Sequence, residues 1–98
     1  MIDGTYRLEV NTPLGHKTTF VTLATQGERI TAGVDAPIIG VQRATGKLVG
    51  DKFAIEGSLK VPLFGIIIYT VVGKVVGDTL LVIIETNKGD FEFTGARV

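Results

Sequence analysis

One hairpin pattern occurs twice in this sequence and constrains the fold more than any other feature. The segment GKLVGDKF at 46–53 returns at 73–80 as GKVVGDTL. In both copies a Gly-Asp pair separates two apolar, β-branched runs. Glycine reaches positive φ at little steric cost and aspartate hydrogen-bonds its own backbone, so each pair predicts a tight turn between antiparallel strands.

Alternation of apolar and polar residues extends this pattern along the whole chain. It predicts eight strands, over 4–11, 16–25, 29–35, 39–49, 53–61, 66–76, 79–86 and 91–97. No window has helical periodicity, and the connections are too short for a helix crossover or a Greek-key return. A meander that closes on itself removes both sheet edges. We therefore expect one all-β domain over 1–98, an eight-stranded antiparallel up-and-down barrel.

Counting outward from the turns predicts which side chains meet inside the barrel. The expected pairs are Leu23 with Ile30, Leu48 with Phe53, and Val75 with Leu80. Several inward positions carry small residues, which we expect to leave room for a ligand: Ala32, Ala44, Gly46, Gly57 and Gly73.

Composition excludes several function classes. Ten basic and ten acidic residues cancel, and no basic run exists, which argues against nucleic-acid or anionic-membrane partners. The absence of cysteine rules out disulfides and thiolate sites, and a single histidine argues against a metal, so no cofactor is predicted. The apolar run 61–73 is shorter than the roughly 20 residues of a membrane span. Asp3 argues against a signal peptide, which leaves the cytoplasm as the default location.

The two ends of the chain carry a further pattern, DGTY at 3–6 and TGAR at 94–97. It resembles the calycin signature of lipocalins and avidins, in which an arginine of the last strand lies across a first-strand aromatic ring and closes one barrel end. Together with TPLG at 12–15 and the repeated hairpins, it is similar to small bacterial calycin-like barrels, some attached to flavin-dependent reductases. The resemblance implies a barrel-end plug of Tyr6 and Arg97, with Tyr6 replacing the usual Trp. A ligand clamp is the alternative role.

Three inward positions are polar, namely Gln42, Tyr69 and Thr19. Small-molecule sites are usually apolar pockets with a few such groups. The three side chains could hydrogen-bond a ligand, or equally one another or water.

Other polar candidates favour structural roles. His16, beside a turn and next to Lys17, could act as a general base, but no second catalytic residue accompanies it and a solvated loop histidine is preferred. Glu56 and Glu85 could form an acid–base pair, yet the register puts both outside, so a salt-bridged surface is preferred.

The segments 66–76 and 79–86 are apolar on both faces. Their outward residues include Ile66, Ile68, Val72, Leu81 and Ile83, with Lys74 at the rim. Such a patch is large for a soluble monomer. It predicts a homodimer or higher oligomer; a shifted register or a covering loop would be the alternatives.

These features support three hypotheses. The first is a non-enzymatic binding module for a small apolar molecule inside the barrel, oligomeric through the apolar strands. The second is a structural or assembly domain with a solid core and no ligand, perhaps beside a reductase. The third is a small barrel isomerase or cyclase, for which the sequence places no inward acid or base.

Overall fold

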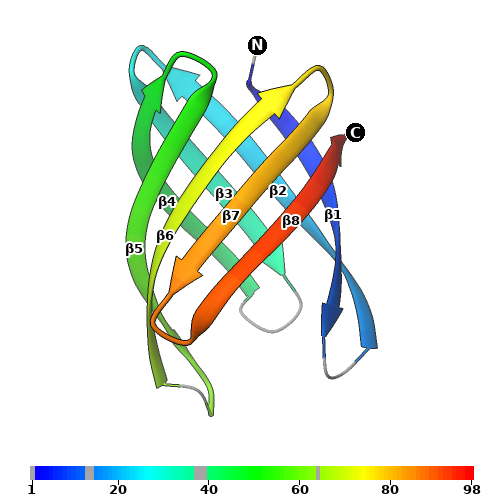
Figure 1. Cartoon of the computed structure of the whole chain (residues 1–98), viewed down its shortest axis with the longest axis vertical. Coiled ribbons are helices and arrows are strands. Elements are labelled where there is room, and N and C mark those ends of the chain that lie inside the picture. The colour runs from blue at the N-terminus through cyan, green and yellow to red at the C-terminus, as the bar shows by residue number, and fades with distance from the viewer. Residues whose placement is uncertain (1, 13–14, 37–39, 64) are drawn as a thin grey trace.

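The eight predicted strands form a closed barrel in the computed structural model, which describes residues 2–12, 15–36, 40–63 and 65–98. Each strand pairs antiparallel with its neighbours, and the last returns to the first (Figure 1). The fold class and the up-and-down order are confirmed, with strand limits shifted by a residue or two. The TPLG turn lies partly outside the described residues. The strands are β1 (Gly4–Thr12), β2 (Gly15–Gln26), β3 (Arg29–Ala36), β4 (Gly40–Val49), β5 (Lys52–Val61), β6 (Gly65–Val76), β7 (Thr79–Thr86) and β8 (Gly89–Arg97).

Three two-residue turns close the hairpins at the end of the barrel where the termini lie (Figure 1). Their first residues, Gly27, Gly50 and Gly77, have φ of 62°, 64° and 61°. The residue after each glycine has negative φ, which is the pattern of a type II′ turn. A residue with a Cβ is strained at the first position, so glycine at these turns fixes the register of six strands.

The predicted pairs Leu48 with Phe53 and Val75 with Leu80 are confirmed. The predicted pairing of Leu23 with Ile30 is wrong, since Leu23 lies opposite Ala32. The turn consists of Gly27 and Glu28, so the ladder starts at Gln26 and Arg29, one residue later along each strand than the count assumed. The partner of Leu23 is shifted by two residues along β3, and because side chains alternate between the two faces of a strand, each one keeps its predicted face.

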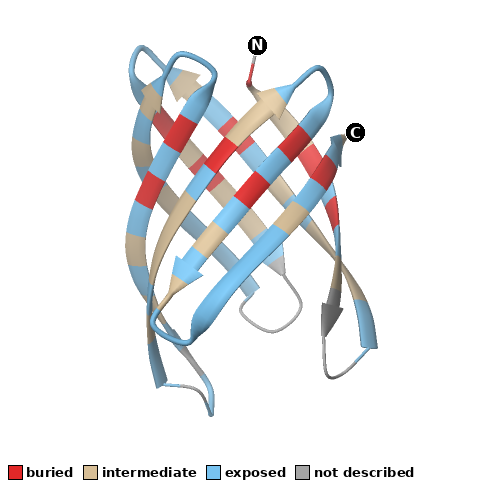
Figure 2. Ribbon diagram, in the orientation of Figure 1, coloured by how far each residue is buried: buried red, intermediate tan, exposed pale blue. Residues whose placement is uncertain are grey.

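The core occupies the half of the barrel nearer the termini, where the buried residues gather (Figure 2). Its fully buried large side chains are Tyr6, Leu23, Ile30, Ile55 and Leu80. The opposite half is lined by partly buried side chains. The barrel is therefore packed at one end and hollow toward the other.

Three of the inward glycines do not leave empty space, contrary to the sequence-based expectation. The ring of Phe53 lies over Gly73, and the Tyr69 hydroxyl lies 2.6 Å from where a Gly57 Cβ would stand. Gly46 is likewise filled, by the backbone of Ala54 and the side chain of Ile55. Each glycine accommodates a neighbouring strand's atoms, so the hollow owes its volume to other positions.

Pairing is short at two opposite seams of the barrel. The β4–β5 ladder runs only from Lys47–Ala54 to Val49–Lys52, and the β1–β8 ladder only from Tyr6–Arg97 to Leu8–Gly95. Every other ladder is longer. The barrel thus consists of two well-paired halves, β1–β4 and β5–β8, that are joined firmly only near the packed end.

Candidate functional site

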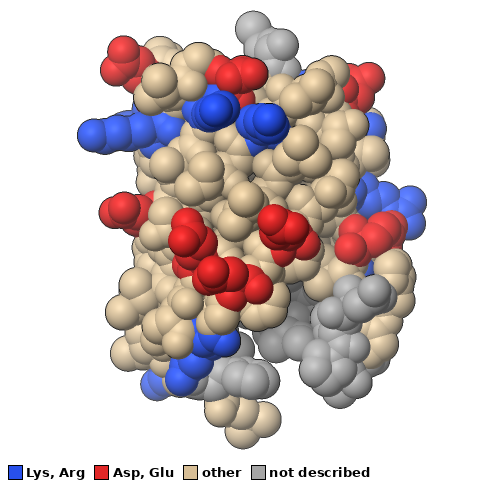
Figure 3. Space-filling view, in the orientation of Figure 1, with Lys and Arg blue, Asp and Glu red and all other residues tan. Residues whose placement is uncertain are grey.

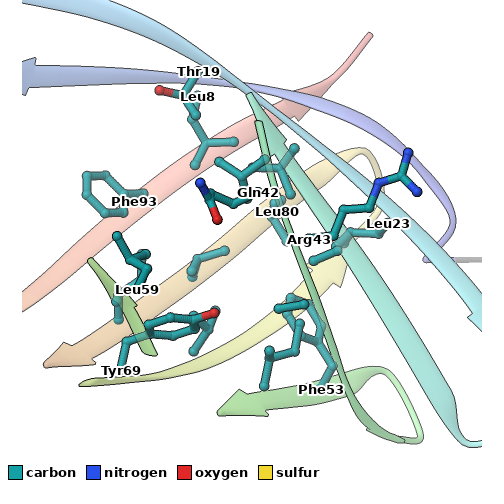
Figure 4. A pocket seen from close by; sticks show the side chains of 18 of the residues that line it. Leu8, Thr19, Leu23, Gln42, Arg43, Phe53, Leu59, Tyr69, Leu80 and Phe93 are labelled. Carbon is teal, nitrogen blue, oxygen red and sulfur yellow. The ribbon is translucent and has the colours of Figure 1, made fainter. Parts of the chain in front are cut away.

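A cavity of about 320 Å³ fills the hollow half of the barrel, and all eight strands contribute to its wall. Its lining is almost entirely aliphatic and aromatic, with leucine, valine, isoleucine and phenylalanine side chains from every side (Figure 4). Small-molecule pockets commonly measure about 300–1,000 Å³, so this cavity lies at the small end of that range.

The three polar residues predicted to face inward all line this cavity. Gln42 of β4 and Tyr69 of β6 extend into it from opposite walls, and Thr19 lies at its edge (Figure 4). Among the residues that the structure describes, the hydroxyl of Tyr69 has no hydrogen-bond partner. This half-buried hydroxyl in an apolar wall could therefore hydrogen-bond a polar group of a molecule bound in the cavity.

Sequence reasoning missed two polar residues of the lining, Thr86 and Arg43. The Thr86 hydroxyl is engaged locally, because it donates to the Gly89 carbonyl at 2.5 Å and accepts from the Lys88 amide at 3.0 Å. Arg43 has outward parity but stands where β4 is no longer paired with β5. It lines both the cavity and a hollow on the outer wall. No sequence signal marks where a ladder stops.

The packed end is closed by Tyr6, whose side chain is fully buried. The guanidinium carbon of Arg97 lies 4.9 Å from the centre of the Tyr6 ring, within the range of a cation–π contact. The Tyr6 hydroxyl donates to the Ile2 carbonyl at 2.7 Å. Burial raises the pKa of this hydroxyl above its ordinary value. Neither residue lines the cavity, so the geometry fits a structural plug better than a ligand clamp.

Arg97 is held by the turns and the N-terminal segment around it. Its guanidinium donates to the Asp3 carbonyl and, at 3.1 Å, to the Asp78 carboxylate in the second repeated turn. A Cβ at Gly4, where φ is 150°, would collide with the guanidinium. Because Gly4 has no side chain, it leaves room for the Arg97 guanidinium two residues before Tyr6.

Asp3 ties the N-terminal segment to β2. Its carboxylate accepts from the Thr25 hydroxyl at 2.5 Å and from the Thr25 amide at 3.0 Å. These two hydrogen bonds hold the pKa of the Asp3 carboxyl below its ordinary value. The same residue thus anchors Arg97 through its carbonyl and β2 through its side chain.

His16 lies on β2, not in a loop, and is exposed outside the barrel. Its Nε2 is 2.6 Å from a Glu9 carboxylate oxygen, and Arg7 lies 2.7 Å from the other. The hydrogen bonds from His16 and Thr18 lower the pKa of the Glu9 carboxyl. The predicted solvated loop histidine is therefore corrected to a strand residue in a surface polar cluster, away from the cavity.

Glu56 and Glu85 are both exposed, as the register predicts. They flank Thr70 on adjacent strands. The expected salt bridges are not there: within the described chain neither carboxylate has an ion-pair partner. Their cross-strand neighbour is a threonine, and the lysines of this face stand farther along the strands.

The outer apolar residues of β6 and β7 are exposed. The exposed fractions are 63% for Ile66, 61% for Ile68, 40% for Val72, 36% for Leu81 and 44% for Ile83. No described loop covers them, so that alternative is wrong. On β8, Phe91 has the same parity as the cavity-lining Phe93 but is 49% exposed, and the two rings stack with their centres 6.3 Å apart.

No three histidine or carboxylate side chains among the described residues are grouped closely enough to hold a metal ion. The described part of the chain also contains no helix with the length and hydropathy needed to cross a membrane.

Comparison with known proteins adds no relative. No family model, no curated protein and no solved structure matches this chain.

Proposed function

We propose that this chain is a binding module for a small, largely apolar molecule held inside the barrel. The observation that carries the proposal is the cavity of about 320 Å³, which lies beyond the end closed by Tyr6 and Arg97 and has a mostly apolar lining. A liquid water molecule occupies about 30 Å³, so the cavity suits a ligand of roughly ten to fifteen non-hydrogen atoms. A solid core would leave no such space.

The polar groups of the wall define the ligand further. The Tyr69 hydroxyl, with Gln42 across the cavity and Thr19 at its edge, favours a molecule with one hydroxyl or carbonyl group on a hydrocarbon body. No carboxylate or imidazole stands among the described lining residues. Binding rather than acid–base catalysis is therefore the function we propose, ahead of the isomerase or cyclase.

We also place the chain with the calycin-like barrels. Support comes from the closed eight-stranded meander, the arginine of β8 over the aromatic ring of β1, and Gly4 making room for that arginine. Calycins use this architecture to bind small apolar molecules inside the barrel.

A series of straight-chain alcohols from six to twelve carbons tests the proposal, with binding followed by calorimetry. We expect affinity to rise with chain length until the cavity is full, and then to fall. Tyr69→Phe keeps the ring over Gly57 and should weaken alcohols about tenfold while leaving hydrocarbons of equal length unchanged. No binding by any member of the series would refute the proposal and leave the structural domain as the better hypothesis.

A matched pair of variants locates the binding. Ala44 lines the cavity, whereas its neighbour Thr45 is exposed on the outer face. Ala44→Phe should fill the cavity and abolish binding, and Thr45→Phe should bind as the parent does. Equal loss in both variants, or in neither, would contradict binding inside the barrel.

A further inference from the structure

The outer wall of β5 to β8 carries charges in rows that run across the strands. One row, near the packed end, contains Lys52 and Lys74, joined across the ladder to Leu81. The next row is mostly apolar and joins Ala54, Val72 and Ile83, ending at Glu92. The third row joins Glu56, Thr70, Glu85 and Asp90. Basic and acidic rows therefore lie at equal distances on either side of an apolar row, each about 7 Å from it.

Figure 3 shows this face, with lysine and arginine atoms toward the packed end, a group of carboxylates across the middle, and other atoms between them. Carboxylates also lie at the packed end itself, and further basic atoms lie beyond the middle group, toward the opposite end. Within the described chain, none of the lysines and carboxylates of the two charged rows has an ion-pair partner. These charges are thus available to a surface of the opposite pattern.

We propose that this face binds a second copy of the chain, as a two-fold dimer whose axis runs along the apolar row. A two-fold axis in the plane of the interface reverses the order of the rows. The basic row of one copy then faces the acidic row of the other, and Lys52 stands opposite Glu56 of its partner copy. Both copies contribute the same contacts, as an isologous interface requires.

The apolar side chains fit the same arrangement. Val72 and Ile83 lie on the axis and meet their own counterparts. Ile68, two rows from the axis, lies opposite Val76, which is two rows away on the other side and 56% exposed. The proposed axis brings one pair of like charges together, because Glu92 at the end of the apolar row also meets its own counterpart. The alternative axis, parallel to the strands between β6 and β7, would place Glu56 against Asp90 at two symmetric positions and would leave the lysines of the basic row facing no carboxylate.

The surface is small, which sets the expected strength. Four strands and five rows measure about 15 by 27 Å, or roughly 400 Å² of flat area per copy. Stable interfaces bury about 800 Å² per partner, so this contact belongs with weak, reversible ones. We expect a dissociation constant of tens to hundreds of micromolar. The proposal is independent of any ligand in the cavity.

Sedimentation of the unmodified chain from 5 to 500 µM provides the first test. In 50 mM salt we expect dimers to form over this range. In 500 mM salt the dissociation constant should rise severalfold, because the facing rows are exposed and screened. A monomer at 500 µM in low salt would overturn the proposal.

Charge exchange tests the orientation. The Lys52→Glu, Lys74→Glu double variant makes both rows acidic, and Glu56→Lys, Glu85→Lys makes both basic. Each variant alone should dimerise at least tenfold more weakly than the parent, whereas an equimolar mixture of the two should form heterodimers. Arg29→Glu, an exposed change on β3, is the control and should dimerise as the parent does.

All four exchanged residues are partly or fully exposed, and circular dichroism will verify that each variant is folded. Variants that fail to associate when mixed, or that still dimerise alone, would show that a different face or axis is used and would overturn the proposal.

Discussion

Arg97 is the residue whose loss should most damage the closed end of the barrel. Arg97→Ala removes at least the cation–π contact with Tyr6, the hydrogen bond to the Asp3 carbonyl, and the ion pair with Asp78. A cation–π contact contributes about 1 kcal/mol and a charged hydrogen bond about 1.5 kcal/mol or more. The ion pair adds little, because the Asp78 side chain is 84% exposed.

Together with the lost packing of the arginine stem, we expect Arg97→Ala to lower the free energy of unfolding by about 3 kcal/mol. For a chain of this size each kcal/mol shifts the melting temperature by about 4–8 °C, so the midpoint should fall by about 12–24 °C. Urea unfolding followed by far-ultraviolet circular dichroism gives the free energy directly. Alcohol binding to the folded variant should be nearly unchanged.

Two controls separate the contributions. Asp78→Asn removes only the exposed ion pair and should cost less than about 0.5 kcal/mol. Arg97→Lys keeps the charge but loses the planar group that covers Tyr6, and should fall between the parent and the alanine variant. A loss below about 1 kcal/mol in Arg97→Ala, or an equal loss in Asp78→Asn, would refute the reasoning.

Three other predictions concern the fold. Gly73→Ala puts a methyl group against the Phe53 ring and should cost about 1–3 kcal/mol in urea unfolding, whereas Gly33→Ala, with open space around it, should stay within about 0.5 kcal/mol; equal effects would contradict the packing described. Because the pKa of Asp3 is lowered in the folded chain, its contribution is present above about pH 4 and is lost as the pH falls through the folded value. In Asp3→Asn the free energy of unfolding should therefore decrease less as the pH is lowered below about 4. The same decrease as in the parent would argue against the role of Asp3. Tyr6→Phe removes a buried hydrogen bond and should cost about 1–2 kcal/mol by the same urea assay, provided that the Ile2 carbonyl finds no other donor.

The sequence by itself determined the strand order and the face of nearly every side chain. Both are local properties. A type II′ turn requires glycine at its first position, and alternation along a strand then decides which residues face inward. For this reason even the shifted pairing of Leu23 left the side chains on their predicted faces, including Gln42 on the weakly patterned β4, although Arg43 and Thr86 of the lining were missed.

Only the tertiary structure decided how much space remains inside the barrel and which side chains line it. The rings of Phe53 and Tyr69 fill the space beside Gly73 and Gly57, where the sequence alone predicted empty space. A glycine in the sequence does not reveal which distant side chain will pack against it. The end of the β4–β5 ladder, which exposes Arg43 to the cavity, depends on the twist of the whole barrel. The volume and the lining of the cavity arise from contacts between residues far apart in the chain, and no local pattern encodes them.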